Sequence, residues 1–65
     1  MLIHRDNNSY TCYLGDNGTL DTLIIIDGID HYIECEFASQ YRDKQGNITK
    51  QGFIELCNWI IDNEC

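Results

Sequence analysis

The segment from Asp43 to Glu55, DKQGNITKQGFIE, contains the residue types of a calcium-binding loop. An EF-hand loop needs a glycine at its sixth position and a bidentate glutamate at its twelfth. When Asp43 is taken as the first position, those places are held by Ile48 and Ile54, neither of which can serve. The spacing therefore predicts that the segment binds no calcium and that its polar residues have a structural role.

That role is predicted to be a turn followed by a helix. Gly46 can adopt the positive φ that a tight turn requires. The side-chain oxygen of Asn47 or Thr49 can then accept a hydrogen bond from the free amides of a first helical turn. The segment is thus interpreted as the connection into a C-terminal helix.

The cysteines Cys12, Cys35, Cys57 and Cys65 are the next candidates for chemistry, and none of them forms a CxxC pair. The usual spacing of a zinc site is therefore missing. We expect four free thiols, with the first three buried as small apolar side chains and Cys65 exposed. Two disulfides and a metal site are the alternatives.

The remaining polar residues do not form a catalytic pattern. Ser9 and Ser39 have no triad context, and the stretch from Gly15 to Gly18 carries an acid where a phosphate would bind. Glu34 and Glu36 could hold a metal ion, but paired surface carboxylates are usually only solvated. We predict a protein that is not an enzyme, with no catalytic residues, no cofactor and no metal.

The chain is short and strongly acidic. It has 65 residues, with 11 Asp and Glu against 4 Lys and Arg, and a net charge of −7. This balance disfavours direct binding to nucleic acid or to an anionic membrane, and it favours a basic protein surface as the partner. The first ten residues lack the apolar region of a signal peptide, which predicts a cytoplasmic protein.

Two segments show clear periodicity. Residues 29–37 alternate between apolar and polar side chains, which predicts a half-buried strand. Residues 53–61 repeat with a helical period, which predicts a helix over 49–63. Three further strands are expected over residues 1–5, 9–14 and 19–27.

Turns between these strands predict how they pair. A two-residue turn at Asp27-Gly28 places Ile24 beside His31 and Thr22 beside Ile33. A three-residue loop over 16–18 places Cys12 beside Thr22 and Leu14 beside Leu20, and a turn at Asn7-Asn8 places Ile3 beside Cys12. All three turns put the apolar residues on one face.

The predicted fold is α+β: residues 1–65 form one compact acidic domain, a four-stranded antiparallel meander with one C-terminal helix packed on one face. The residues expected in its core are Ile33, Phe37, Phe53, Cys57 and Ile60. Trp59 is expected on the flank of the helix. His31 is expected at the rim of the covered face with its ring hydrogen-bonded.

The other face of the sheet is the predicted binding surface. The register places Tyr13, Asp21 and Glu34 in one row with Leu2, and Glu36 beyond Glu34. Asp21 opposite Glu34 is a like-charged cross-strand pair, which costs stability that a cationic partner could offset. The predicted partner-binding residues are Tyr13, Asp21, Leu23, Asp30, Tyr32, Glu34 and Glu36.

No family motif is recognised in the chain. In size, acidity and lack of proline it resembles in type the small inhibitors encoded by phages and mobile elements, including anti-CRISPR and anti-restriction proteins. This resemblance implies an inhibitor that occludes the basic, nucleic-acid-handling surface of another protein. The alternative is a homodimeric structural or regulatory subunit of a larger complex.

Overall fold

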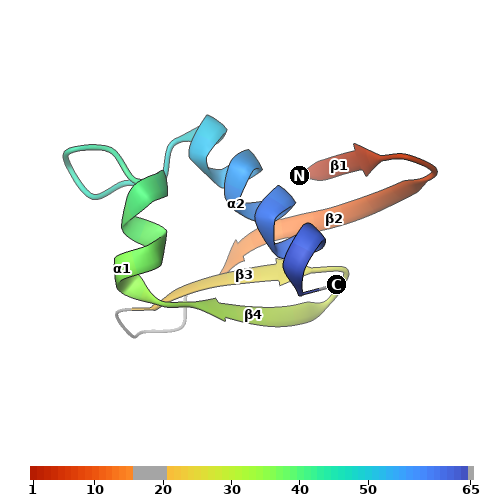
Figure 1. Ribbon diagram of the computed structural model, residues 1–65, viewed down its shortest axis with the longest axis horizontal. Helices are drawn as coiled ribbons and strands as arrows, with labels where there is room; N and C mark the ends of the chain where they lie inside the picture. Colours follow the sequence, from red (N-terminus) through yellow and green to blue (C-terminus); the bar gives the residue numbers. More distant parts are fainter. Residues whose placement is uncertain (16–20, 65) are drawn as a thin grey trace.

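The computed structural model describes residues 1–15 and 21–64 (Figure 1). Within these residues the elements are β1 (Leu2–Arg5), β2 (Asn8–Gly15), β3 (Thr22–Ile26), β4 (Ile29–Ile33), α1 (Cys35–Ala38), the 3-10 helix η1 (Ser39–Tyr41) and α2 (Lys50–Asn63). The strands form one antiparallel sheet in the order β1-β2-β3-β4. The predicted α+β meander with a C-terminal helix is confirmed.

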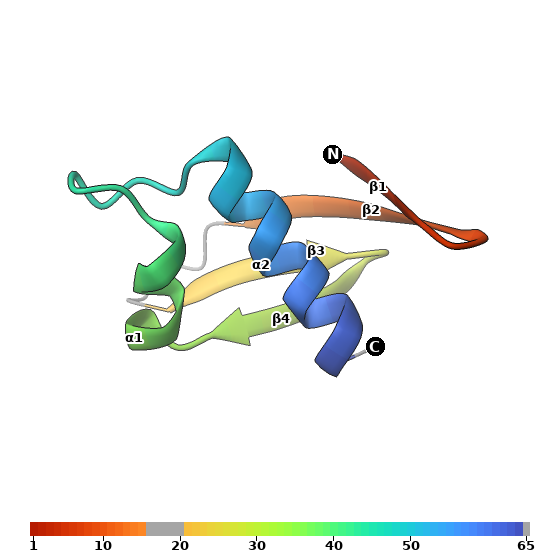
Figure 2. The ribbon, with the colours of Figure 1, turned by 45° about the horizontal axis from the view of Figure 1, so that its top comes forward.

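Helix α2 lies across one face of the sheet, and α1 lies near the end of β4 (Figures 1 and 2). The core between helix and sheet consists of Ile3, Cys12, Ile24, Ile26, Ile33, Ala38, Leu56, Cys57, Ile60 and Ile61. The predicted burial of Ile33, Cys57 and Ile60 is confirmed. Phe37 and Phe53 are only half-buried and pack against the margin of this core, as does Trp59 on the flank of α2.

The hairpin between β3 and β4 is the one that its sequence predicts. Asp27 and Gly28 have φ values of 50° and 82°, the positive values that a two-residue type I′ turn requires. Ile24 pairs with His31 and Thr22 with Ile33. The local preference of the Asp-Gly pair therefore determines this register.

The first hairpin turns one residue earlier than predicted. Asp6 has a φ of 54° and forms the turn with Asn7, so Asn8 already belongs to β2. Ile3 consequently pairs with Tyr10 and not with Cys12. Aspartate tolerates the left-handed region better than most residues, which explains its place in the turn. Because the shift is two residues, each side chain still lies on its predicted face.

The register between β2 and β3 is four residues away from the prediction. Cys12 pairs with Ile26, and Leu14 with Ile24. Asp27 stabilises this register: its carboxylate accepts the Thr11 amide at 2.9 Å, and its own amide donates to the Thr11 carbonyl at 2.9 Å. The predicted loop at 16–18 and the partner Leu20 lie outside the described residues.

The last strand is shorter than predicted, because β4 ends at Ile33 and the chain then turns into α1 and η1. The alternating pattern of residues 29–37 is therefore misleading beyond Ile33. The helical turn buries Ala38 completely and brings Phe37 against Trp59 of α2. Burial of these side chains is thus more favourable than extension of β4.

The segment before α2 is the predicted turn and cap. Gly46 has a φ of 86°, and the Asp43 carboxylate accepts the amides of Gln45 and Asn47, both at 2.9 Å. Thr49 is the N-cap, and its hydroxyl accepts the Gly52 amide at 2.9 Å. The residue types that suggested a calcium loop therefore satisfy the chain's own backbone.

Among the helices of the described residues, none has the length and apolarity needed to cross a bilayer.

Candidate functional site

The outer face of the sheet is the face that α2 leaves uncovered. The alternation along each strand places on it Leu2, Thr11, Tyr13, Leu23, Ile25, Asp30 and Tyr32. Tyr13 lies beside Ile25, which lies beside Asp30. The predicted row of Tyr13 with Leu2, Asp21 and Glu34 is wrong, because the two shifted registers move β1 and β2 along the sheet.

Leu23, predicted as an exposed contact residue, is buried, with 8% of its surface accessible. Its side chain lies over Gly15, where a Cβ atom would come within 2.6 Å of Leu23 Cδ2. The missing side chain of Gly15 therefore gives Leu23 a place to pack on the outer face. This removes Leu23 from the predicted contact surface.

Two of the predicted acids are exposed just beyond the strand ends. Asp21 precedes β3, and Glu34 is the N-cap of α1. The last paired residues there are Thr22 and Ile33, so the predicted like-charged pair lies outside the strand ladder. The two acids therefore follow the last pair of the ladder and are not a cross-strand pair within it.

Glu36 is in the first turn of α1, not on the outer face beyond Glu34. The reason is the early end of β4, after which the helical turn sets the direction of each side chain. What remains together on the outer face is Tyr13, Asp30 and Tyr32, all of them exposed. Tyr13 and Tyr32 are 57% and 61% exposed, so two phenol rings and a carboxylate are available to a partner.

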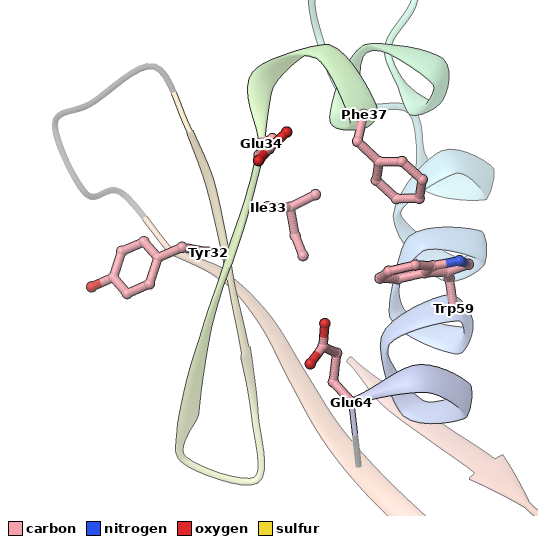
Figure 3. A pocket seen from close by; sticks show the side chains of 6 residues that line it. All are labelled: Tyr32, Ile33, Glu34, Phe37, Trp59 and Glu64. Carbon is pink, nitrogen blue, oxygen red and sulfur yellow. The ribbon is translucent and has the colours of Figure 1, made fainter.

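A pocket that sequence reasoning missed lies between β4, α1 and α2. It has a volume of about 320 Å³ and is lined by Tyr32, Ile33, Glu34, Phe37, Trp59 and Glu64 (Figure 3). The rings of Phe37 and Trp59 pack with centroids 4.7 Å apart at an interplanar angle of 49°. Tyr32 contributes to the strand side, and its ring points away from the others. The sequence did not predict this pocket, because Phe37 packs against Trp59 only when its segment forms α1 and not a continuation of β4.

Two of the cysteines lie in the core and a third is exposed. Cys12 and Cys57 are fully buried, as expected, but the thiol of Cys35 is exposed. The expected burial of Cys35 is wrong because that residue begins α1. Burial raises the pKa of Cys57 to about 12, and the charge and hydrogen bonding of the neighbouring Cys12 add to the shift. Cys57 therefore remains a neutral thiol at physiological pH.

His31 also differs from its expectation. Its Nε2 atom is buried and has no hydrogen-bond partner within the described residues. An unpaired buried polar atom costs about 1–3 kcal/mol. His31 therefore lies at the rim of the covered face with its Nε2 atom unpaired among the described residues.

In the described ranges, no group of three or more His, Cys, Asp and Glu side chains could hold a metal ion. Comparison with known proteins gives no significant match to a family model, a curated protein or a solved structure.

Proposed function

We propose that this protein is a small acidic, non-enzymatic binding domain that occludes a basic, nucleic-acid-handling surface of another protein. In this role it is an inhibitor of the phage or mobile-element anti-defence type, acting in the cytoplasm. The observation that carries the proposal is the distribution of charge. Every acidic residue in the described part of the chain is exposed, on a molecule with a net charge of −7.

The basic residues do not neutralise this surface evenly, because both arginines are engaged within the fold. Arg5 forms an ion pair with Asp62 and donates to the Asn58 carbonyl at 3.3 Å. Arg42 donates to the buried Thr22 hydroxyl at 2.6 Å and to the Gly46 carbonyl at 2.7 Å. The acids thus dominate the field that an approaching protein meets, which steers basic partners and repels nucleic acid.

Tyr13, Asp30, Tyr32 and Glu34 are the contact residues that we propose. Tyrosines are enriched in protein interfaces because a phenol combines a large apolar surface with a hydrogen-bonding group. The carboxylates of Asp30 and Glu34 would pair with lysine or arginine at the rim, where charge sets the association rate. These residues combine contact area with the sign of charge that the proposed partner requires.

A capture experiment tests the proposal. The immobilised protein is exposed to a bacterial lysate, and the bound proteins are identified before and after a salt wash. We expect basic nucleic-acid-binding proteins that elute as salt rises, since exposed charges are screened within about 8 Å at physiological ionic strength. Asp30→Lys should abolish capture, whereas Glu55→Lys, an equal charge change on α2, should not. Capture that survives both the Asp30 change and high salt would contradict the proposal.

A homodimer is the second candidate, favoured by one edge of β2. Within the described residues, β1 pairs with β2 as far as Thr11, and the backbone of Met1 adds hydrogen bonds to Cys12. The rest of β2, from Tyr13 to Gly15, pairs only with β3, so its other edge is open. Met1, Tyr13 and Leu14 are exposed beside this edge. Such an edge can pair with a second chain. Sedimentation at several concentrations distinguishes the two, because only the homodimer gives a mass that rises with concentration.

A further inference from the structure

The pocket between β4, α1 and α2 combines aromatic faces with carboxylates at its margin. Phe37 and Trp59 are half-buried, so part of each ring remains accessible from the pocket. In Figure 3 the Trp59 ring is seen almost edge-on, with Phe37 on one side of its plane and the Glu64 carboxylate toward the other. Glu34 lies at the opposite margin, at the end of β4. A ligand in the pocket would therefore meet an indole face and two acids.

The electrostatics of this pocket favour a cation. A tryptophan ring attracts a positive charge to its face, and Trp is the best of the aromatic residues at doing so. The carboxyl end of α2 adds to the attraction, because a helix carries a partial negative charge at its C-terminus. The last turn of α2 contains no basic residue, and Glu64 is the C-cap. Arg5 of β1 pairs with Asp62 in this turn, whereas Glu64 adds its negative charge at the very end of the helix.

We propose that this pocket binds the guanidinium group of an arginine side chain presented by a basic protein. This inference rests on the proposed function, because the basic partner protein supplies the arginine. The guanidinium is planar, so it can stack on the face of the Trp59 ring that lies toward Glu64 and donate its N–H groups to the Glu64 carboxylate, while Glu34 adds negative charge at the opposite margin.

The size and shape of the pocket agree with this occupant. A volume of about 320 Å³ is at the lower limit of ordinary ligand pockets, which suits one side chain better than a large cofactor. An ammonium group is a compact and strongly hydrated charge that cannot stack, so lysine should bind more weakly than arginine. An anion would meet both carboxylates and the helix C-terminus, and the pocket should reject it.

A small probe tests the pocket directly. N-acetyl-arginine N-methylamide is titrated into the protein while the fluorescence of Trp59, the only tryptophan in the chain, and the backbone amide shifts are followed. We expect saturation with a dissociation constant on the order of 1 mM, because exposed cation–π and ion-pair contacts are individually weak. The shift changes should centre on Ile33, Phe37 and Trp59. The citrulline analogue, which is neutral and nearly isosteric, should give neither response.

Substitutions at the margin test the role of the acids. Glu34→Gln and Glu64→Gln should each weaken binding of the probe by about two- to fivefold, the range for an exposed ion pair. Glu55→Gln removes an equal charge from an exposed position of α2 outside the pocket and should leave binding unchanged. Equal weakening by all three substitutions would overturn the inference, because it would show an effect of net charge alone. Binding of citrulline as tightly as arginine would also overturn it.

A longer probe separates the failure of this inference from that of the proposed function. A blocked peptide with arginine and glycine in alternation should bind more tightly than the single residue and perturb the same pocket amides. If the peptide instead perturbs only Tyr13, Asp30 and their neighbours, and is unaffected by Glu64→Gln, the pocket inference fails while the proposed function stands. If the single arginine binds in the pocket but lysate capture shows no basic partner, the pocket stands and the proposed function fails.

Discussion

Single residues decide how closely the elements of this protein approach one another. Gly52 lies at the start of α2, where a Cβ atom would come far inside contact distance of the Tyr41 carbonyl oxygen and 2.9 Å from Thr49 Oγ1. Backbone at that contact cannot move without displacing η1. Glycine is therefore needed here for the packing of α2 against η1, although it is a poor helix former.

Gly52→Ala should destabilise the protein by about 1–2 kcal/mol. Overpacking costs about 1–3 kcal/mol, and the better helix propensity of alanine returns up to about 1 kcal/mol. Urea unfolding followed by Trp59 fluorescence measures the change. Gln51→Ala, at an exposed position of the same turn, should change stability by less than about 0.5 kcal/mol. A Gly52→Ala protein that is more stable than the parent would show that η1 can shift to make room for the added methyl group.

Cys57 should make the stability depend on alkaline pH. Its pKa is raised from 9.0 to about 12 in the folded protein, chiefly by burial. Above about pH 9 the unfolded chain therefore holds fewer protons than the folded one, and stability falls as pH rises toward 12, by at most about 1.4 kcal/mol per pH unit. Cys57→Ala should lose this component of the pH dependence. If the free energies of unfolding of the two proteins fall in parallel between about pH 9 and pH 11, Cys57 does not contribute to the pH dependence.

At the scale of elements, the features that depend on neighbouring residues were predictable from the sequence, and those that depend on contacts between distant residues were not. The Asp27-Gly28 turn and the helical period of α2 each depend on residues close in sequence, and both were predicted. The register of β2 depends on Asp27 meeting Thr11 and on Leu23 packing over Gly15, contacts that no local pattern reveals. The aromatic pocket was unpredictable for the same reason, since residues 34–37 continue the alternation of a strand while folding as a helix.

Asp27 should prove important for both the turn and the register. Asp27→Ala should cost about 1–3 kcal/mol, because alanine loses the hydrogen bond from the Thr11 amide and is disfavoured at positive φ. Asp27→Asn should cost less than half as much, since asparagine tolerates this backbone region and its carbonyl can accept the same amide. Urea unfolding measures both changes. Equal losses for the two variants would mean that the charge of Asp27, rather than its geometry, is what matters.

The acidic end of α2 should be a stability cost in the free protein. Glu64→Gln removes a negative charge from the C-cap, where the helix already carries partial negative charge. We expect a gain of about 0.3–1 kcal/mol in the free energy of unfolding at low salt, and a smaller gain at high salt. Thermal unfolding at the two salt concentrations measures it. A loss of stability would show that Glu64 has a structural role in the fold.

At the scale of the whole molecule, the two arginines are engaged within the fold while the acids are exposed. The arginines connect elements, Arg5 from β1 to α2 and Arg42 from the segment after η1 to β3, while the acids lie at the surface. In Figure 3 the Tyr32 ring points to one side of β4 and the rings of Phe37 and Trp59 lie on the other, with Glu34 at the end of that strand. One basic partner wrapping the edge of β4 could therefore contact both.

Competition with nucleic acid tests whether this protein occludes the nucleic-acid-binding surface of its partner. The affinity of a captured basic partner for its nucleic acid is measured by fluorescence anisotropy at increasing concentrations of this protein. Occlusion predicts that the apparent Kd for nucleic acid rises in proportion to the added protein, and that the Asp30→Lys variant has no such effect. A ternary complex in which the nucleic acid binds with unchanged affinity would contradict the claim.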